Sequence, residues 1–243
     1  MRIDRSAFRR NKIDKDSEVI QIIQKIAYRR KRWGYRQICF EMRKKLIINH
    51  KKVYRIYSEL GLKIRMKRVK RKRVQASIKV TIPQNPNEIW AMDFMHDSLR
   101  SGKKIRLLNI IDIYSRECIT SRVEYSINSY RLLNILNELK EERILPKSII
   151  VDNGPEFTSK AFLDWALRNN IDIHFISKGK PTENGYIESF NGKLRNECLN
   201  EHWFNDIEES REILSEWIDH YNNERPHSSL KGLSPMEYLK NVA

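Results

Sequence analysis

The order of apolar segments between residues 88 and 177 constrains the fold of this chain more than any other feature of its sequence. In chain order we expect strands at 88–99, 104–115 and 117–125, a helix at 128–142, a strand at 148–152, a helix at 159–169 and a strand at 172–177. Three consecutive strands followed by alternating helices and strands predict a mixed sheet with helices packed on it, an α/β fold.

Charge divides the chain into two parts. The formal net charge is +16. Residues 1–82 hold 27 Lys and Arg against 6 Asp and Glu, whereas 83–243 hold 20 against 25, so the net charges are +21 and −5. A basic excess of this size is expected of a protein with a polyanionic partner. We therefore predict a basic arm at 1–82 that contacts phosphates and a globular core at 83–243, with Pro83 and Pro86 at the boundary.

The basic arm carries the patterns of short helices. Apolar residues recur at helical spacing in 18–31 and 35–45, and a third helix is expected over 49–60, with an asparagine as its N-cap. Two helices joined by a short link, the second exposing Lys51 and Arg55, favour a helix-turn-helix that binds DNA. A small helical bundle whose basic face is only solvated stays open as the alternative.

A nearly unbroken run of positive charge, KIRMKRVKRKR, follows at 63–73. Such a block of like charges cannot fold on itself and behaves as a flexible polycation. We predict a linker that follows the DNA backbone and becomes ordered on the duplex. Its contacts would come from Lys67, Arg68, Lys70, Arg71, Lys72 and Arg73.

Cysteine usage and hydropathy exclude two classes of protein. Cys39, Cys118 and Cys198 stand far apart and in no metal-ligand spacing, which indicates reduced, unpaired thiols in a cytosolic protein. No apolar run approaches the roughly 18 residues of a membrane span, and no signal peptide is recognisable. We therefore expect neither a disulfide framework nor a membrane partner.

Three carboxylates occupy positions that suit metal ligands. Asp93 and Asp152 lie in or after apolar strands, in IWAMDFMHDSL and SIIVDNGPEF, and Glu188 opens an amphipathic helix in YIESFNGKLRNE. Magnesium prefers oxygen ligands, and a two-metal site clamps the attacking and leaving oxygens between ions roughly 3.5–4 Å apart. Each acid alone is explained as well by a solvated or capping residue. The three together predict a metal site for phosphoryl transfer.

The segment from about Trp90 to Tyr238 resembles the catalytic domain shared by retroviral integrases and bacterial insertion-sequence transposases. It is most similar to the second-frame protein of the insertion sequence three family. The matching stretches are WAMDFMHDSL, LLNIIDIYSREC, VDNGPEF, HFISKGKPTENGYIESFNGKLRNECLNEHWF and YNNERPHSSLKGLSPMEYL, and 35 residues separate Asp152 from Glu188, as in the family. Upstream, WGYRQI and NHKKVYRIYSELGLKIR resemble the helix-turn-helix-like segment before that core.

This resemblance implies an RNase H-like integrase core, with a mixed five-stranded sheet and flanking helices, preceded by a small all-α domain. It places Asp93, Asp152 and Glu188 on the first strand, the fourth strand and the final core helix as the metal-binding triad. Arg195 lies two helical turns after Glu188, where the family has a Lys or Arg, so we expect it to hold the phosphate beside the scissile bond. A solvated helix charge is the alternative. Lys180, Asn184 and Lys193 are the remaining expected DNA contacts.

The resemblance also implies an activity, metal-dependent DNA strand cleavage and strand transfer. Water or a 3′-hydroxyl would attack a phosphodiester in line, with two Mg²⁺ or Mn²⁺ ions bound beside the substrate. The implied partners are the terminal repeats of a mobile element, target DNA, further copies of the chain on DNA and an upstream first-frame protein, in a bacterial cytoplasm at the nucleoid. An RNase H-type nuclease and a non-catalytic DNA-binding regulator derived from a transposase stay open as alternatives.

Overall fold

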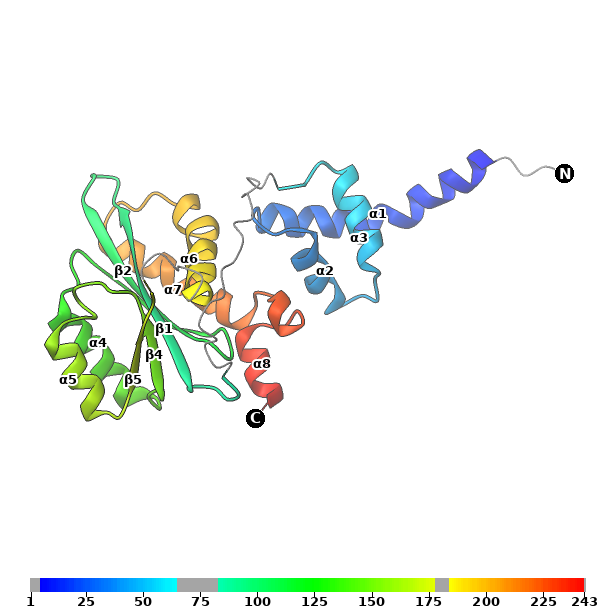
Figure 1. Cartoon of the computed structure of the whole chain (residues 1–243). Coiled ribbons are helices and arrows are strands. Elements are labelled where there is room, and N and C mark those ends of the chain that lie inside the picture. The colour runs from blue at the N-terminus through cyan, green and yellow to red at the C-terminus, as the bar shows by residue number, and fades with distance from the viewer. Residues whose placement is uncertain (1–4, 65–82, 178–183, 243) are drawn as a thin grey trace. The chain divides into compact units, whose positions relative to one another are not determined.

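The computed structural model describes residues 5–64, 83–177 and 184–242 (Figure 1). The chain forms two compact units, Met1–Arg71 with Pro226–Leu233 and Lys72–Arg225 with Ser234–Ala243. The domain boundary predicted after residue 82 falls beside residues 65–82, outside the described residues, and stays a prediction.

The N-terminal unit contains three α-helices around a small apolar core. They are α1 (Arg5–Arg29), α2 (Tyr35–Arg43) and α3 (His50–Glu59), and a short 3-10 helix, η3 (Ser228–Leu230), belongs to the same unit. The Asn49 side chain accepts a hydrogen bond from the Lys51 amide at 2.9 Å and caps α3 as predicted. The three expected helices are confirmed, but α1 begins well before the expected residue 18.

The second unit is built on a five-stranded mixed sheet. Its strands are β1 (Ile89–Ser98), β2 (Lys104–Asp112), β3 (Cys118–Glu124), β4 (Ser148–Val151) and β5 (Asp172–Phe175), in the order β3-β2-β1-β4-β5. β1, β2 and β3 are antiparallel, while β4 pairs parallel with both β1 and β5. The predicted sheet is confirmed.

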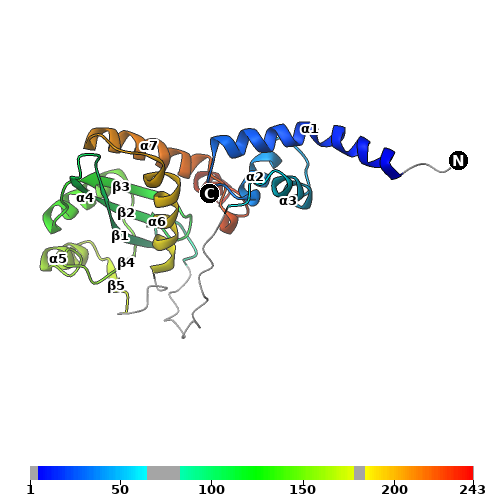
Figure 2. The same cartoon turned by 90° about the horizontal axis from the view of Figure 1, so that it is seen from above.

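Helices cover both faces of this sheet (Figures 1 and 2). One face carries α4 (Ser129–Glu142) and α5 (Lys160–Arg168), and the other carries α6 (Gly185–Glu197) and α7 (Ile207–Asn223); η2 (Leu199–Glu201) and α8 (Pro235–Val242) complete the unit. Strand side chains alternate between the faces, so Met92 packs with α4 and α5 while Ala91 and Met95 pack with α6 and α7. Among the described helices, none is long and apolar enough to cross a membrane.

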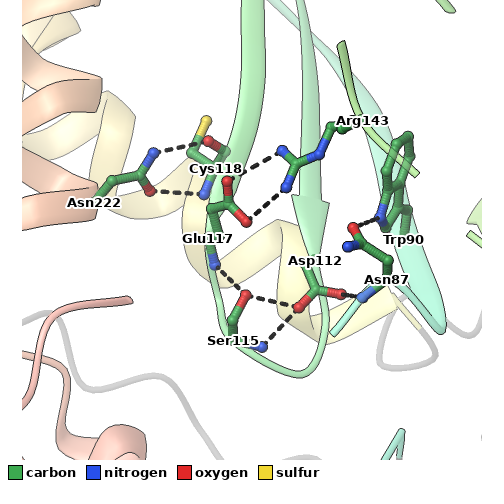
Figure 3. A network of polar contacts seen from close by, with 8 residues as sticks. All are labelled: Asn87, Trp90, Asp112, Ser115, Glu117, Cys118, Arg143 and Asn222. Atoms are coloured by element: carbon green, nitrogen blue, oxygen red, sulfur yellow. Dashed lines mark hydrogen bonds and ion pairs between the residues drawn. The ribbon is translucent and has the colours of Figure 1, made fainter. Parts of the chain in front are cut away.

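β2 ends at Asp112, three residues before the expected end, because the Asp112 carboxylate organises a turn (Figure 3). Asp112 is 1 % exposed and accepts hydrogen bonds from the Ser115 amide at 2.8 Å and the Ser115 hydroxyl at 2.6 Å. On the far side of the turn, the Asn222 side chain bonds the backbone N–H and C=O of Cys118 at 2.9 and 2.8 Å, which ties α7 to β3. The buried Asp112 carboxylate therefore has a structural role in the turn.

Candidate active site

The first carboxylate of the site, Asp93, lies in the middle of β1 on the face covered by α6 and α7. Its Oδ1 accepts a hydrogen bond from the Phe94 amide at 2.8 Å, and its Oδ2 accepts one from Asn191 Nδ2 of α6 at 2.8 Å. The side chain is partly buried. Both oxygens are thus oriented by the protein, each with lone-pair capacity left.

The second carboxylate, Asp152, follows β4 directly. β4 is parallel to β1 with Ala91 opposite Ile150, so continuing the register two residues brings Asp152 level with Asp93. The Gly154 amide donates to Asp152 Oδ1 at 3.0 Å, and a Cβ on Gly154 would stand 2.9 Å from that oxygen. A glycine is therefore needed here for the backbone to approach the carboxylate.

The loop that carries Asp152 is fastened at two further points. Asn153 Nδ2 donates to the Ile176 carbonyl oxygen at 2.8 Å, at the end of β5. Glu156 forms an ion pair with Arg106 of β2, and the guanidinium of Arg106 lies 3.8 Å from the centre of the Phe94 ring. Arg106 lowers the pKa of Glu156, so the ion pair is maintained at neutral pH. Glu156 thus holds the loop rather than pointing a free carboxylate at the site.

The third carboxylate, Glu188, lies in the first turn of α6 and is exposed. The pKa of Asp93 is raised to about 6, first by burial and then by the negative charges of Asp152 and Glu188, while two hydrogen bonds act to lower it. Asp152 and Glu188 are therefore close enough to Asp93 for their charges to act on it. Within the described residues, however, no three His, Cys, Asp or Glu side chains already stand close enough together to hold a metal ion.

A hard divalent cation fits this set of groups. The donors are carboxylate oxygens, which Mg²⁺ and Mn²⁺ prefer, and the pKa of Asp93 is raised by burial and by the charges of Asp152 and Glu188, so a cation bound there would stabilise its charged form. Asp93, Asp152 and Glu188 are the residues that would hold it. Because bare carboxylates repel, a cation would also draw Glu188 toward the other two.

Arg195 lies on α6 as expected, but its guanidinium is occupied within the protein. It pairs with Asp97 Oδ2 of β1 at 3.0 Å and donates to the His96 carbonyl oxygen at 2.5 Å. This arrangement ties the end of α6 to β1. A phosphate contact by Arg195 therefore stays a prediction, and it would require sharing or exchange of the Asp97 carboxylate.

The other predicted DNA contacts fall in different settings. Lys51 is exposed on the first turn of α3, whereas Arg55 pairs with Asp16 and with Glu59. Lys193 donates to Ser189 Oγ at 2.9 Å. Asn184 is 4 % exposed just before α6. Lys180 and the linker residues lie outside the described residues, namely Lys67, Arg68, Lys70, Arg71, Lys72 and Arg73.

Asn191 and Asn109 are polar residues of the site that the sequence reading missed. Asn191 bonds Asp93 directly, and Asn109 Nδ2 donates to Asn191 Oδ1 at 2.7 Å from a fully buried position in β2. One observation could have found them: an amide stands alone in the apolar run of β2, and another follows Glu188 by three residues, on nearly the same helical face. Such amides need buried partners.

Three families of known domains match this chain. The family described as HTH-like domain matches residues 14–73, and two families described as Integrase core domain match residues 83–181 and 169–235. The matches cover the helical unit, the sheet with Asp93 and Asp152, and the helix that carries Glu188.

Similarity to individual proteins agrees with these family matches. The chain is 38 % identical over 229 residues to an uncharacterized 31.7 kDa protein of insertion element IS407 from Burkholderia multivorans, covering 93 % of this chain and 83 % of that protein. It is 30 % identical over 209 residues to an uncharacterized transposase-like protein of Haemophilus influenzae, covering 82 % and 96 %. The HTLV-2 integrase catalytic core domain, solved in complex with magnesium in a dimeric form, matches with a TM-score of 0.52 at 20 % identity, covering 64 % of this chain and 98 % of that one. At this identity the likeness to the solved structure shows the fold alone.

Proposed function

This chain belongs to the transposases of insertion elements that join an HTH-like domain to an integrase core domain, and we propose that it cleaves and joins DNA strands with a divalent metal held by Asp93, Asp152 and Glu188. One observation carries the proposal. Parallel pairing of β1 and β4 puts Asp93 and Asp152 at the same level of adjacent strands, and α6 brings Glu188 near enough to raise the pKa of Asp93.

The residues of the site have distinct roles in this proposal. Asp93 would be the most rigid ligand, because the Phe94 amide and Asn191 fix both of its oxygens. Asp152 would be held by the Gly154 amide on a loop fastened to β5. Exposed Glu188 would complete the site when the DNA and the metal arrive. The bound metal would activate the attacking oxygen and stabilise the leaving oxygen of the phosphodiester.

No covalent link between protein and DNA is required. A metal-activated water can cleave the strand, and the 3′-hydroxyl so released can attack a second phosphodiester directly. The protein must then bind two DNA segments, an element end and a target. We assign DNA-backbone contacts to Lys51 and to the basic residues of 63–73, whose positive charge is suited to phosphates.

The assembly is part of the proposal. The HTLV-2 core has been solved in a dimeric and in a trimeric form, and joining two element ends to one target calls for at least two catalytic cores. We propose that this chain also works as an oligomer on DNA, with Mg²⁺ or Mn²⁺ as its metal and an upstream first-frame protein as a further partner.

A strand-joining assay tests the function. Purified protein is incubated with a labelled, pre-cleaved element end and a supercoiled plasmid, in Mg²⁺, in Mn²⁺ and in EDTA. The Asp152→Asn variant is assayed in parallel, and Asp172→Asn, at an exposed carboxylate on β5, is the matched control. We expect metal-dependent joining by the wild type and the control, and none by Asp152→Asn. The non-catalytic regulator would be favoured if the protein binds DNA but joins no strands in any metal, even after the first-frame protein is added. The RNase H-type nuclease would be favoured if cleavage is confined to RNA–DNA hybrids.

A further inference from the structure

A row of polar side chains crosses the sheet face beneath α6, between apolar residues that pack into the core. Strand register places Asp93 of β1 opposite Asn109 of β2, and Asn109 opposite Ser121 of β3. On the same face, Leu107 and Ile111 flank Asn109 and pack into the apolar core. Asn109 is 0 % exposed. A fully buried amide in the centre of a strand is costly unless all its bonds are made, so the row calls for an explanation.

The row is joined into one continuous hydrogen-bonded chain by Asn191 of α6. The Ser121 hydroxyl donates to Asn109 Oδ1 at 2.6 Å, and Asn109 Nδ2 donates to Asn191 Oδ1 at 2.7 Å. Asn191 Nδ2 then donates to Asp93 Oδ2 at 2.8 Å. In each of the three hydrogen bonds the donor lies on the side away from Asp93, so all three hydrogen bonds point toward Asp93.

The Asp93 carboxylate, which only accepts, settles how each amide is turned. An asparagine side chain can rotate to exchange its oxygen and its nitrogen, and a serine hydroxyl can donate or accept. The nitrogen of Asn191 faces Asp93, so its oxygen is left to accept from Asn109, whose own oxygen accepts from Ser121. Without the outer links, Asn191 would lose the hydrogen bond that holds its amide plane in place against Asp93.

We infer that Ser121, Asn109 and Asn191 form a positioning relay that holds the Asp93 carboxylate for the metal; the inference rests on the proposed function. None of the three needs to touch metal or DNA. Asn191 acts on Asp93 directly, and the two outer residues act through Asn191. Groups that orient metal ligands in this way typically change metal affinity or activity by roughly 10- to 100-fold when removed.

The test measures metal binding as well as activity. Binding of Mn²⁺ to the full chain is followed by the electron paramagnetic resonance signal of free Mn²⁺, and joining is assayed at saturating Mn²⁺. The variants are Asn191→Leu, Asn109→Leu and Ser121→Ala, with Ser121→Thr as the conservative form that keeps the hydroxyl. Asn222→Ala is the matched control, because Asn222 also bonds the backbone across the unit but has no link to Asp93.

We expect Asn191→Leu to weaken Mn²⁺ binding roughly tenfold or more, Asn109→Leu to weaken it by less, and Ser121→Ala by the least. Ser121→Thr should behave as the wild type. Asn222→Ala should lower the melting temperature without changing Mn²⁺ affinity. The double variant Asn109→Leu/Asn191→Leu should bind Mn²⁺ as Asn191→Leu does, because the outer link acts only through the inner one.

Wild-type Mn²⁺ affinity in a folded Asn191→Leu protein would overturn the relay, and so would additive losses in the double variant. If Asn191→Leu does not fold, Asn109→Leu decides: unchanged affinity overturns the relay and weakened affinity supports it. The proposed function fails separately, if the wild type shows no Mn²⁺ binding that is lost in Asp93→Asn. In that case there is no bound metal for which Asp93 must be positioned, and the relay is overturned as well.

Discussion

The two faces of the central sheet are equally well covered by helices but differ in chemistry. Toward α4 and α5, β1 and β2 present Trp90, Met92, Leu108 and Ile110, all fully buried in an apolar core. Toward α6 and α7, the same strands interrupt an apolar core with Asp93 and Asn109, and β3 adds Ser121 to the row. Polar groups in a buried layer reduce stability unless they are fully bonded. One face is thus explained by folding alone, whereas the polar row on the other is expected if that face also holds the proposed metal.

The largest expected effect follows from Asp93→Asn on the polar face. The change removes a proposed ligand and keeps the shape, so joining should fall by more than about a hundredfold, beyond the loss caused by removing groups that only orient ligands. Without metal, the protein should be as stable as the wild type or more so at pH 7, because Asp93 is charged there against burial and two other carboxylates. Joining rates and urea unfolding in EDTA give the two measurements. Full joining activity by Asp93→Asn would show that the polar face does not hold the catalytic metal.

The opposite result is expected for Phe162→Ala on the apolar face. Phe162 of α5 is 0 % exposed, so truncation should lower the free energy of unfolding by about 3–5 kcal/mol. Below the melting temperature, joining per folded molecule should be unchanged. Urea unfolding with a parallel joining assay checks both; a selective loss of joining would mean that this face also positions the site.

A smaller change in activity is expected for Gly154→Ala. The new Cβ would stand 2.9 Å from Asp152 Oδ1, which is closer than real Cβ contacts allow, so the carboxylate or its loop must move. We expect a loss of joining of roughly tenfold and weaker Mn²⁺ binding, with little change in melting temperature. Gly185→Ala, where nothing lies within 4 Å of the added Cβ, is the matched control. Equal behaviour of the two variants would show that Asp152 tolerates displacement.

The pH dependence of stability gives a subtler test of the polar face. In the metal-free folded protein the pKa of Asp93 is raised from 3.8 to about 6, so the folded state binds a proton that the unfolded state has lost between those values. The free energy of unfolding should therefore fall as pH rises from about 4 to about 6, by on the order of 2 kcal/mol from this group. Urea unfolding of the wild type and Asp93→Asn across pH 4–7 isolates the effect of Asp93 and of its coupling to Asp152 and Glu188, since groups that do not interact with Asp93 cancel in the difference. A constant difference would contradict the raised pKa of Asp93, which burial and the two neighbouring carboxylates produce.

The smallest effect is expected in the N-terminal unit, where exposed and paired cations can be compared on α3. Lys51→Ala should weaken DNA binding and reduce the slope of log affinity against log salt by about 1, with no change in melting temperature. Lys52 pairs with Asp16 at 2.7 Å, so Lys52→Ala should instead lower the melting temperature. Fluorescence anisotropy with a DNA duplex over a salt series, beside thermal unfolding, separates the two. A salt slope left intact by Lys51→Ala would remove that lysine from the DNA contact.

The sequence was sufficient to predict the strands, the helices up to α5 and the elements that carry Asp93, Asp152 and Glu188, but the bounds of α7 and α8 were not predicted. The predicted elements follow from local patterns: apolar runs, caps and breaks in periodicity. The relay through Asn109 and Asn191 was not predicted, because it depends on strand register and on where α6 crosses the sheet. The pairing of Arg195 with Asp97 was missed for the same reason, since the two residues are far apart in sequence.

The most direct test of the three-carboxylate site is cleavage of the protein backbone by iron. Fe²⁺ in place of Mg²⁺, with ascorbate and peroxide, generates hydroxyl radicals that cut the chain beside the bound ion, and the fragments are mapped by mass spectrometry. The account predicts cuts near residues 93, 152 and 188 together, all suppressed by excess Mg²⁺ and all lost in Asp93→Asn. Cuts at only one of these places, or cuts that persist in Asp93→Asn, would contradict it.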